Sequence, residues 1–244
     1  MSDFVFEIGL EEMPARFLPD LESGFEGLAR DYLDSEHIGH ADVYTYSTPR
    51  RLVLWIEDIA QTQETRSELI TGPPQAIAYC ESGELSKAGQ GFARSQGVDE
   101  GELFIQETPK GPYLAVRKQV GGQATQDILT EICAQIVSKL AMPKRMRWEA
   151  SGFSFARPIR WLLALLDETI VPVQVASLHA GRTSRGNRVH GAGPWEVPSA
   201  QAYFGIMRDT ARVVLTRQER TLLIQDQGIA LDQDPGRNLV WKKY

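Results

Sequence analysis

Cysteine is scarce in this sequence, and long apolar runs are missing from it. The 244 residues contain two cysteines, Cys80 and Cys133, which are too few and too far apart to indicate a disulfide scaffold or a zinc site. Cys133 falls on an apolar helical stripe, so we expect a buried, reduced thiol. The longest apolar run, 161–166, is far shorter than a membrane span, and the first residues do not combine a basic segment with an apolar one. These observations favour a cytoplasmic protein without membrane partners.

The familiar motifs of nucleotide and metal chemistry are also missing. The Gly-Gln-Gly run at 89–91 lacks the spacing and the lysine of a phosphate loop. Glu7, Glu11 and Glu12 could form a carboxylate cluster for metal or acid–base chemistry, but no histidine lies near them in sequence. Adjacent acids cannot face one site from a regular strand, and solvated acids at a helix entrance are favoured by the helix dipole. We therefore expect no catalytic residue and no metal ligand here.

The hydrophobic pattern predicts an α+β fold with mixed strands and helices in one or two lobes. An apolar content of 42% and a charged content of 24% are ordinary for a globular protein. Apolar runs and alternation predict strands at 4–9, 43–46, 52–56, 103–106, 113–120, 170–175 and 212–215. Helical spacing predicts helices at 17–37, 86–95, 128–140 (with Thr125 as N-cap), 158–166, 199–207 and 217–225. Because no regular βαβ rhythm connects them, α+β fits better than a doubly wound sheet.

One change in composition suggests an internal boundary. A polar stretch over 61–72 is closed by Gly72-Pro73-Pro74, which is typical of a linker. We divide the chain into 1–62, the first part of an N-terminal α+β lobe; 63–140, a second α+β lobe or insertion; 141–227, a basic α+β part; and 228–244, an end that we leave unassigned.

Charge is distributed unevenly along the chain. The whole chain carries a formal net charge of −6. The window 139–188 contains nine lysines and arginines against three acids, so its charge is +6 and the remainder sums to −12. Seven of the nine are arginines, all of them at or after residue 145, and the planar guanidinium matches phosphate oxygens bidentately and stacks on bases. The window therefore predicts a surface that faces RNA or another polyanion.

Ten basic residues are candidates for RNA contacts. Arg182, Arg185 and Arg188 recur at intervals of three in a flexible loop, although a solvated charged loop is the alternative. Arg50 and Arg51 form a second pair, of which one could face solvent and the other could pair with an acid. The full set is Arg50, Arg51, Lys144, Arg145, Arg147, Arg157, Arg160, Arg182, Arg185 and Arg188.

Two tryptophans and a proline lie among these cations. Trp148 and Trp161 could stack on bases, or they could belong to the core. Pro158 fits the first turn of the helix expected at 158–166, which would place Arg157 and Arg160 on one face.

Six short stretches, taken together, resemble the β subunit of bacterial heterotetrameric glycyl-tRNA synthetase. They follow the family's order across nearly two hundred residues. Leu10, Met13 and Asn187 depart from the usual pattern, but none of the three is a candidate arginine. The stretches are Glu7 to Pro14 (EIGLEEMP), Ser47 to Leu52 (STPRRL), Ser86 to Arg94 (SKAGQGFAR), Pro143 to Trp148 (PKRMRW), Phe155 to Trp161 (FARPIRW) and Arg182 to Gly186 (RTSRG).

The resemblance implies a fold, partners and a division of labour. It covers the family's N-terminal part, ahead of a domain similar to HD phosphohydrolases and an anticodon-binding domain. That part resembles the body and tail regions of archaeal CCA-adding enzymes. The family implies that the α subunit carries the class II core, with ATP and Mg, and that the β subunit grips tRNA(Gly) within an α2β2 ligase. No cofactor is expected in these residues.

Two other functions stay open at this point. One is a freestanding RNA-binding accessory protein that shares the module. The other is an enzyme for a small anionic metabolite, with the arginines as substrate clamps. Both RNA-binding hypotheses predict an affinity that falls steeply with salt, whereas the metabolite enzyme predicts a pocket that collects the arginines and binds little RNA.

Overall fold

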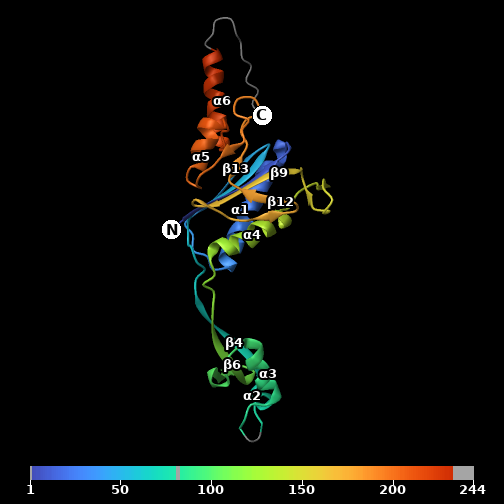
Figure 1. Ribbon diagram of the computed structural model, residues 1–244, viewed down its shortest axis with the longest axis vertical. Coiled ribbons are helices and arrows are strands. Elements are labelled where there is room, and N and C mark those ends of the chain that lie inside the picture. Colours follow the sequence, from blue (N-terminus) through green and yellow to red (C-terminus); the bar gives the residue numbers. More distant parts are fainter. Residues whose placement is uncertain (1, 81–82, 233–244) are drawn as a thin grey trace. The chain divides into compact units, whose positions relative to one another are not determined.

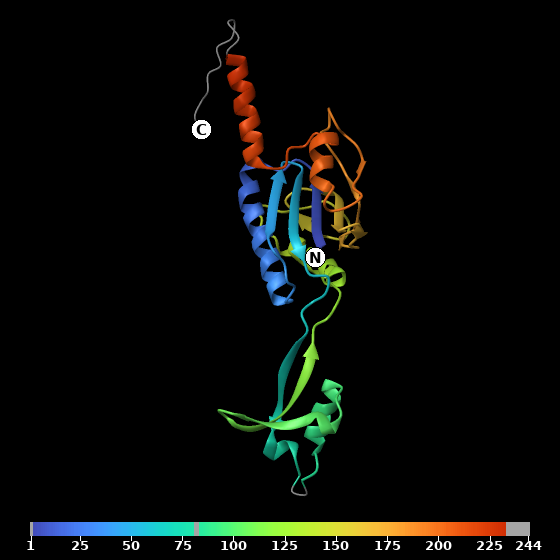
Figure 2. The same cartoon turned by 90° about the vertical axis from the view of Figure 1, so that its left-hand side faces the viewer.

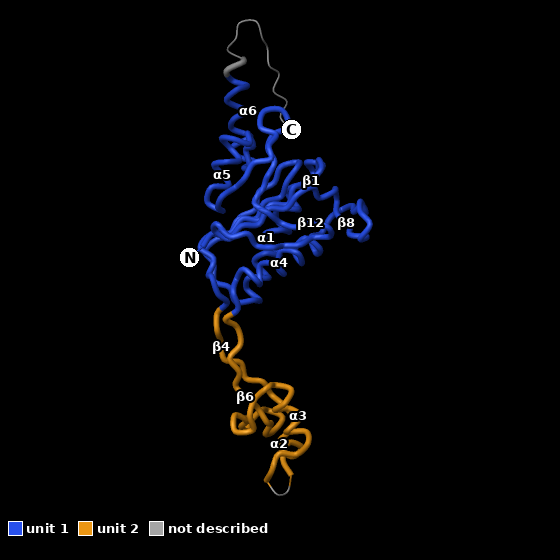
Figure 3. The backbone as a smooth tube through the Cα atoms, viewed as in Figure 1, with its two compact units in different colours: residues 1–63, 123–244 blue, residues 64–122 orange. Residues whose placement is uncertain are grey.

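The computed structural model describes residues 2–80 and 83–232 and has mixed α+β architecture (Figure 1). The chain divides into two compact units (Figure 3). Unit 1 comprises Met1–Gln63 together with Gln123–Tyr244, and unit 2 comprises Glu64–Gly122. Residues 123–140, which we assigned to the second lobe, therefore belong to unit 1. Most of the end that we left unassigned, 233–244, lies outside the described residues.

Unit 1 is built on a mixed sheet whose central strand is the first one. β1 (Ser2–Leu10) pairs antiparallel with both β3 (Arg51–Ile59) and β9 (Ile159–Leu166). The sheet order is β11-β12-β9-β1-β3-β2, and β10 adds to β9. The outer strands are β2 (Val43–Thr48), β10 (Thr169–Ile170), β11 (Gln174–Val175) and β12 (Leu178–Gly181).

Both faces of this sheet are covered, which explains the nearly continuous apolar sequence of its central strands. Phe4, Phe6 and Ile8 enter the larger core, against α1 (Leu18–Ser35) and α4 (Thr125–Lys139). Val5 enters a second core on the opposite face. In Figure 2 the blue helix α1 and the orange segment with α5 lie on opposite sides of the strands.

The second core is closed by the C-terminal part of unit 1. This part contains β13 (Thr183–Ser184), β14 (Trp195–Glu196), α5 (Tyr203–Gly205) and the π-helical turn η3 (Ile206–Thr210), and it contributes Val197, Tyr203 and Met207 to the second core. The remaining elements of unit 1 are η1 (Ala15–Phe17), the hairpin β7 (Met146–Arg147) and β8 (Ser154–Phe155), and α6 (Arg217–Asp232).

Unit 2 is a three-stranded antiparallel sheet with short helices. β6 (Gly111–Val120) lies between β4 (Arg66–Pro74) and β5 (Leu103–Thr108). The helices are α2 (Gln75–Ala78), η2 (Glu100–Glu102) and α3 (Lys87–Gln96), which begins at the side-chain cap Ser86 and ends at the left-handed Gly97.

The chain leaves and re-enters unit 1 at adjacent points. The N–H of Gln63 donates to the carbonyl of Gln123 at 2.9 Å, and Thr62 and Ala124 form an antiparallel bridge. Unit 2 is thus inserted between β3 and α4 of unit 1.

Most predicted elements are confirmed, and the exceptions have physical causes. The helix predicted at 158–166 is wrong, because these residues form β9, whose side chains pack into a core on each face of the sheet. The polar stretch at 61–72 is not a linker throughout, since β4 begins at Arg66. Residues 212–215 are not a strand, and the helix expected from residue 199 begins at Tyr203. Thr125 starts α4 rather than capping it, and its hydroxyl donates to the carbonyl of Ala60 at 2.5 Å.

Candidate nucleic-acid interface

A buried ion pair lies beneath the candidate interface. Glu7 of β1 and Arg51 of β3 are 0% and 1% exposed, and Oε1 of Glu7 lies 3.2 Å from Nη1 of Arg51. The indole N–H of Trp161 donates to Oε1 of Glu7 at 3.1 Å, and the hydroxyl of Ser184 donates to Oε2 at 2.6 Å. These bonds satisfy a charge that would otherwise be costly to bury. The expectation that Glu7 is solvated is wrong, because the alternation of β1 directs it into the second core.

Arg51 is a support of the interface rather than part of its surface. Its Nη2 donates to the carbonyl of Arg185 at 2.5 Å, and its Nη1 lies 2.9 Å from the sulfur of Met207. The prediction that Arg51 contacts RNA is corrected, since its guanidinium is enclosed by the second core. Through its hydrogen bond to the carbonyl of Arg185, Arg51 instead holds in place the backbone of the loop that carries this residue.

Trp161 forms the floor of the site. The ring is 8% exposed, so it belongs to the core, as one of the two interpretations held. The guanidinium carbon of Arg50 lies 5.9 Å from the ring centroid and that of Arg185 lies 5.4 Å from it. Cation–π contacts of this kind orient the two guanidinium groups without neutralising their charge. Trp148 is half-buried and packs beside Phe153 at the edge of the larger core.

Besides the buried Arg51, six arginines line two hollows that share Arg50, Gly186 and Arg188, and we call these six the arginine surface. Arg50, Arg160, Arg185 and Arg188 line a hollow of about 470 Å³ with Glu11 and Gly186. A second hollow of about 600 Å³ shares Arg50 and Arg188 and adds Arg212 and Arg220. The arginine surface therefore consists of Arg50, Arg160, Arg185, Arg188, Arg212 and Arg220.

The arginine surface carries more positive charge than its own acids balance. Glu11 pairs with Arg160 and Arg188 at 3.3 and 3.4 Å, and Glu12 pairs with Arg188 at 3.0 Å. Six arginines against these two glutamates leave a local charge of +4. Among the ion pairs of the described residues, neither Arg50 nor Arg185 takes part in one.

The surroundings of Arg50 destabilise the charged form of its guanidinium. Burial lowers the pKa of its guanidinium, and the neighbouring charges of Arg188 and Arg51 lower it further, against Glu11 and Glu12, which raise it. Its Nε is buried without a hydrogen-bond partner, and its Nη1 reaches the carbonyl of Gly186 only at 3.5 Å. A donor group in this state is stabilised by an anion, and phosphate oxygens fit that requirement.

The remaining predicted residues do not line either of the two hollows. Arg182 donates to the carbonyls of Glu168 and Pro198 at 3.0 and 3.3 Å. Arg145 donates to the carbonyls of Leu140 and Ser138 at 2.6 and 3.1 Å. Lys144 and Arg147 are exposed at the β7–β8 hairpin, whose β8 lies across unit 1 from α5 in Figure 3. Arg157 is half-buried. The basic window therefore does not form one continuous face.

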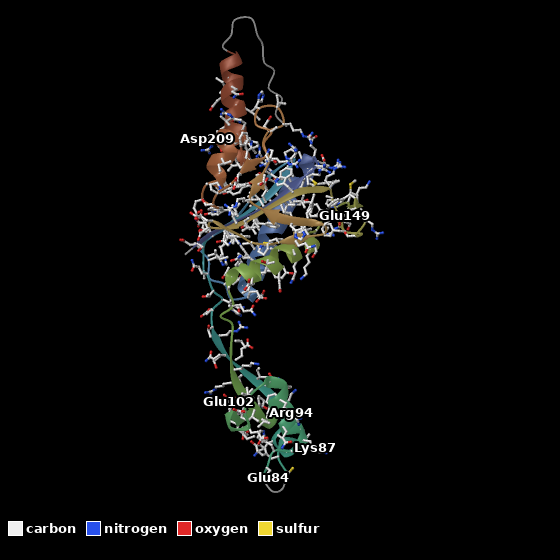
Figure 4. The ribbon with its side chains drawn as sticks, in the orientation of Figure 1. Glu84, Lys87, Arg94, Glu102, Glu149 and Asp209 are labelled. Carbon is white, nitrogen blue, oxygen red and sulfur yellow. The ribbon has the colours of Figure 1, made fainter. Side chains whose placement is uncertain are left out.

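The same hairpin is anchored by an acid. Glu149, labelled in Figure 4, accepts a hydrogen bond from the hydroxyl of Ser177 at 2.6 Å and another from Ser151. These hydrogen bonds lower the pKa of the Glu149 carboxyl. The hairpin is thus tied to the edge of the sheet by a charged acceptor.

Two members of the arginine surface, Arg212 and Arg220, were missed by the sequence analysis. Both lie outside the basic window. Nη1 of Arg220 donates to the carbonyls of Val214 and Leu215 at 2.9 and 2.7 Å, and burial lowers the pKa of its guanidinium. Arg212 has a left-handed backbone, with φ of 55°. Only the packing of the segment after η3 brings these residues back to Arg50, and no spacing along the chain signals that return.

Two features are absent from the described residues. These residues contain no group of three or more His, Cys, Asp or Glu side chains arranged to hold a metal ion. No helix within 2–80 and 83–232 is long and apolar enough to cross a membrane.

The fold and the interface together define an α+β protein with a local arginine-rich surface on an acidic body, an arrangement typical of polyanion-binding proteins. Residues 4–243 match the family model described as glycyl-tRNA synthetase beta subunit. The chain belongs to this family, which confirms the resemblance drawn from the six stretches. The match also includes most of 228–244, the range that we left unassigned.

Curated relatives agree with this membership. The chain is 43% identical over 240 residues to a glycine–tRNA ligase beta subunit of Solidesulfovibrio magneticus, covering 98% of this chain and 34% of that protein. It is 43% identical over 242 residues to the corresponding subunit of Oleidesulfovibrio alaskensis, covering 99% and 35%. A subunit from Moorella thermoacetica is 39% identical over 225 residues, covering 92% and 32%. The chain thus spans about a third of the length of these relatives.

Four of the six family stretches meet at the candidate interface. Glu7 to Pro14, Ser47 to Leu52, Phe155 to Trp161 and Arg182 to Gly186 supply the buried ion pair, its hydrogen-bond partners and three of the six surface arginines, namely Arg50, Arg160 and Arg185. Ser86 to Arg94 lies in unit 2, where Figure 4 labels Lys87 and Arg94 of α3. Pro143 to Trp148 enters the β7–β8 hairpin.

Proposed function

We propose that this chain is a tRNA-binding part of a glycyl-tRNA synthetase β subunit and that the arginine surface holds the sugar-phosphate backbone of tRNA(Gly). In this proposal the ATP-dependent ligation of glycine occurs at an α subunit within an α2β2 complex, where ATP and Mg bind, and the complex acts in the cytoplasm. Similarity to the body and tail regions of CCA-adding enzymes remains an expectation for the fold.

One observation carries the proposal: guanidinium groups are held in place but left without counter-charge. Arg50 and Arg185 lie over Trp161 within cation–π distance, and neither belongs to an ion pair of the described residues. Solubilising arginines would not require a buried ion pair and a buried indole to orient them. Phosphodiester oxygens supply the missing partners, and they do so without reading base sequence.

Salt dependence of tRNA binding tests the proposal. The affinity of the chain for a tRNA(Gly) transcript should fall with salt with a log–log slope of about −3.5 to −4.5, if about five phosphates are contacted at roughly 0.7 to 0.9 per contact. R185A should weaken binding and reduce the magnitude of that slope by about 1. R182A is the matched control, because Arg182 belongs to the same loop but donates to backbone carbonyls away from the arginine surface.

The open alternatives give different results in the same experiments. An enzyme that clamps a small anion would bind tRNA weakly and show no difference between R185A and R182A. A freestanding RNA-binding protein would show the tRNA dependence but would not associate with a glycyl-tRNA synthetase α subunit. Co-purification with that subunit, using the β subunit in its full length, separates the freestanding RNA-binding protein from the proposed function.

A further inference from the structure

The acids at the rim of the arginine surface are held as firmly as the arginines themselves. Glu11 and Glu12 follow directly after β1. The N–H of Glu11 donates to the carbonyl of Pro158 at 3.0 Å. On either side, the N–H groups of Leu10 and Met13 donate to the carbonyls of Arg50 and Pro49 at 2.7 and 2.6 Å. The backbone of this acidic segment is therefore fixed to the two segments that carry Arg50 and Arg160.

Glu11 contacts its arginines in the way a phosphodiester could. Its Oε1 forms an ion pair with Nε of Arg160 at 3.3 Å, and its Oε2 accepts a hydrogen bond from Nη2 of Arg188 at 3.4 Å. A phosphodiester also presents two anionic oxygens that can bridge two guanidinium groups. Glu12 adds a second acceptor for Arg188 at 3.0 Å. The carboxylates thus occupy positions on these arginines that backbone phosphates would need.

These pairs are exposed enough to be exchanged. The side chains of Arg160 and Arg188 are 54% and 55% exposed, and those of Glu11 and Glu12 are 41% and 66% exposed. Ion pairs in such contact with water contribute little to stability, so an incoming polyanion can replace them. By contrast, the ion pair of Glu7 and Arg51 is closed to solvent and cannot respond in this way.

We propose that Glu11 and Glu12 determine the specificity of the arginine surface by competing with phosphate for Arg160 and Arg188. Arg50 and Arg185 are open to any phosphate, whereas Arg160 and Arg188 are released only to a ligand that replaces both carboxylates together. A flexible single strand gains few contacts at once, but a folded RNA presents several phosphates at fixed spacing. Repulsion of the wrong ligand is one of the two general ways to obtain specificity. This inference rests on the proposed function, whose ligand it restricts to folded RNA backbone.

The test compares E11Q/E12Q with wild-type chain on two probes, a tRNA(Gly) transcript and poly(U) of matched length. Glutamine keeps the size of each side chain and removes its charge. Binding of both probes should become tighter, and poly(U) should gain more, so that the tRNA to poly(U) affinity ratio falls. The log–log salt slope for poly(U) should steepen by about 1.4, from two added contacts at roughly 0.7 each.

A matched control separates competition at the site from a change in overall charge. E107Q/E131Q removes two exposed acids from β5 and α4 and changes the net charge by the same amount. It should leave the affinity ratio and the poly(U) slope at wild-type values. Circular dichroism establishes that each variant is folded, and the single variant E12Q, at the more exposed position, supplies a milder form of the test.

Two results would overturn the inference. If E11Q/E12Q behaves like E107Q/E131Q while R185A still weakens tRNA binding, the carboxylates do not compete and the proposed function stands. If E11Q/E12Q weakens tRNA binding, the acids support the loop instead. Failure of the proposed function has a different signature, because R185A and R182A would then bind tRNA equally.

Discussion

Gly9 and Trp161 face each other across the β1–β9 pair, and the indole lies against the bare backbone of the glycine. A Cβ placed on residue 9 would lie 2.0 Å from two atoms of the ring. The register shift between Gly9 and Leu10 occurs at the same point. The missing side chain is what lets the indole lie flat enough to receive Arg50 and Arg185 while its N–H reaches Glu7.

We expect G9A to displace Trp161 and to disturb the arginine surface. Overpacking of this kind costs about 1–3 kcal/mol of stability, and the orientation of Arg50 and Arg185 should be lost with it. Urea denaturation and tRNA binding measure the two effects. The control is G27A in α1, where a Cβ would meet nothing within 4 Å and where alanine should stabilise the helix by up to about 1 kcal/mol. Equal effects of the two substitutions would contradict the assignment.

Loss of the Glu7 charge should be severe. E7Q leaves Arg51 buried without a counter-charge, and breaking a buried pair in this way costs about 3–5 kcal/mol. E26Q is the comparison, because it breaks the half-exposed pair with Arg30 in α1, which is worth about 0.3–0.5 kcal/mol. Chemical denaturation of both variants gives the difference. A small loss for E7Q would mean that the second core admits water.

The two cysteines should differ strongly in reactivity. Cys80 is exposed, whereas Cys133 is 0% exposed in α4 and burial raises the pKa of its thiol. Because the thiolate is the reactive form, a disulfide reagent at mild alkaline pH should label one thiol per chain rapidly and the second only after unfolding. C80S should remove the rapid phase. Two rapid thiols would contradict the burial of Cys133.

Asp167 should stabilise the folded protein at neutral pH, and this contribution should be lost at acid pH. Burial acts to raise the pKa of its carboxyl, but hydrogen bonds from the N–H of Asp3 and the side chains of Ser2 and Gln201 outweigh it, so the pKa is lowered. The Asp3 and Gln201 bonds measure 2.9 and 2.7 Å. A folded-state pKa below the unfolded value of about 3.9 gives stability that is present above that pH and is lost as the pH falls through the folded pKa.

D167N should therefore melt at a lower temperature than wild type at pH 7, and the difference should shrink below about pH 4. Melting curves between these pH values provide the measurement. A gap that stays constant across the range would show that the charge of Asp167 is not involved.

The sequence predicted the secondary-structure elements of unit 1 better than it predicted which arginines lie together. Apolar alternation located β1, β3 and the amphipathic helices, because these depend on local periodicity. It could not show that Glu7 faces inward, since its partner Arg51 is 44 positions away in sequence. Spacing along the loop treated Arg182 and Arg185 alike, although a short strand turns one toward backbone carbonyls and the other toward Trp161.

The error at 158–166 has the same origin. Pro158 and the apolar residues after it satisfy helical and strand patterns equally well over such a short run. Pairing with β1 favours the strand over the helix, because β1 provides a hydrogen-bonding edge for β9 and the sheet has a core on each face. Tertiary context of this kind, like the return of Arg212 and Arg220 to Arg50, is not encoded in any single stretch.

The hydrogen bond between Gln63 and Gln123 joins the two ends of the inserted unit 2. Hydrogen bonds within unit 1 hold its two attachment points, 62–63 and 123–124, next to each other. The sheet that supports the arginines therefore keeps its register whatever the length of the segment between these points. Residues 64–122 can therefore be lengthened, shortened or replaced without a change in the sheet that supports the arginine surface.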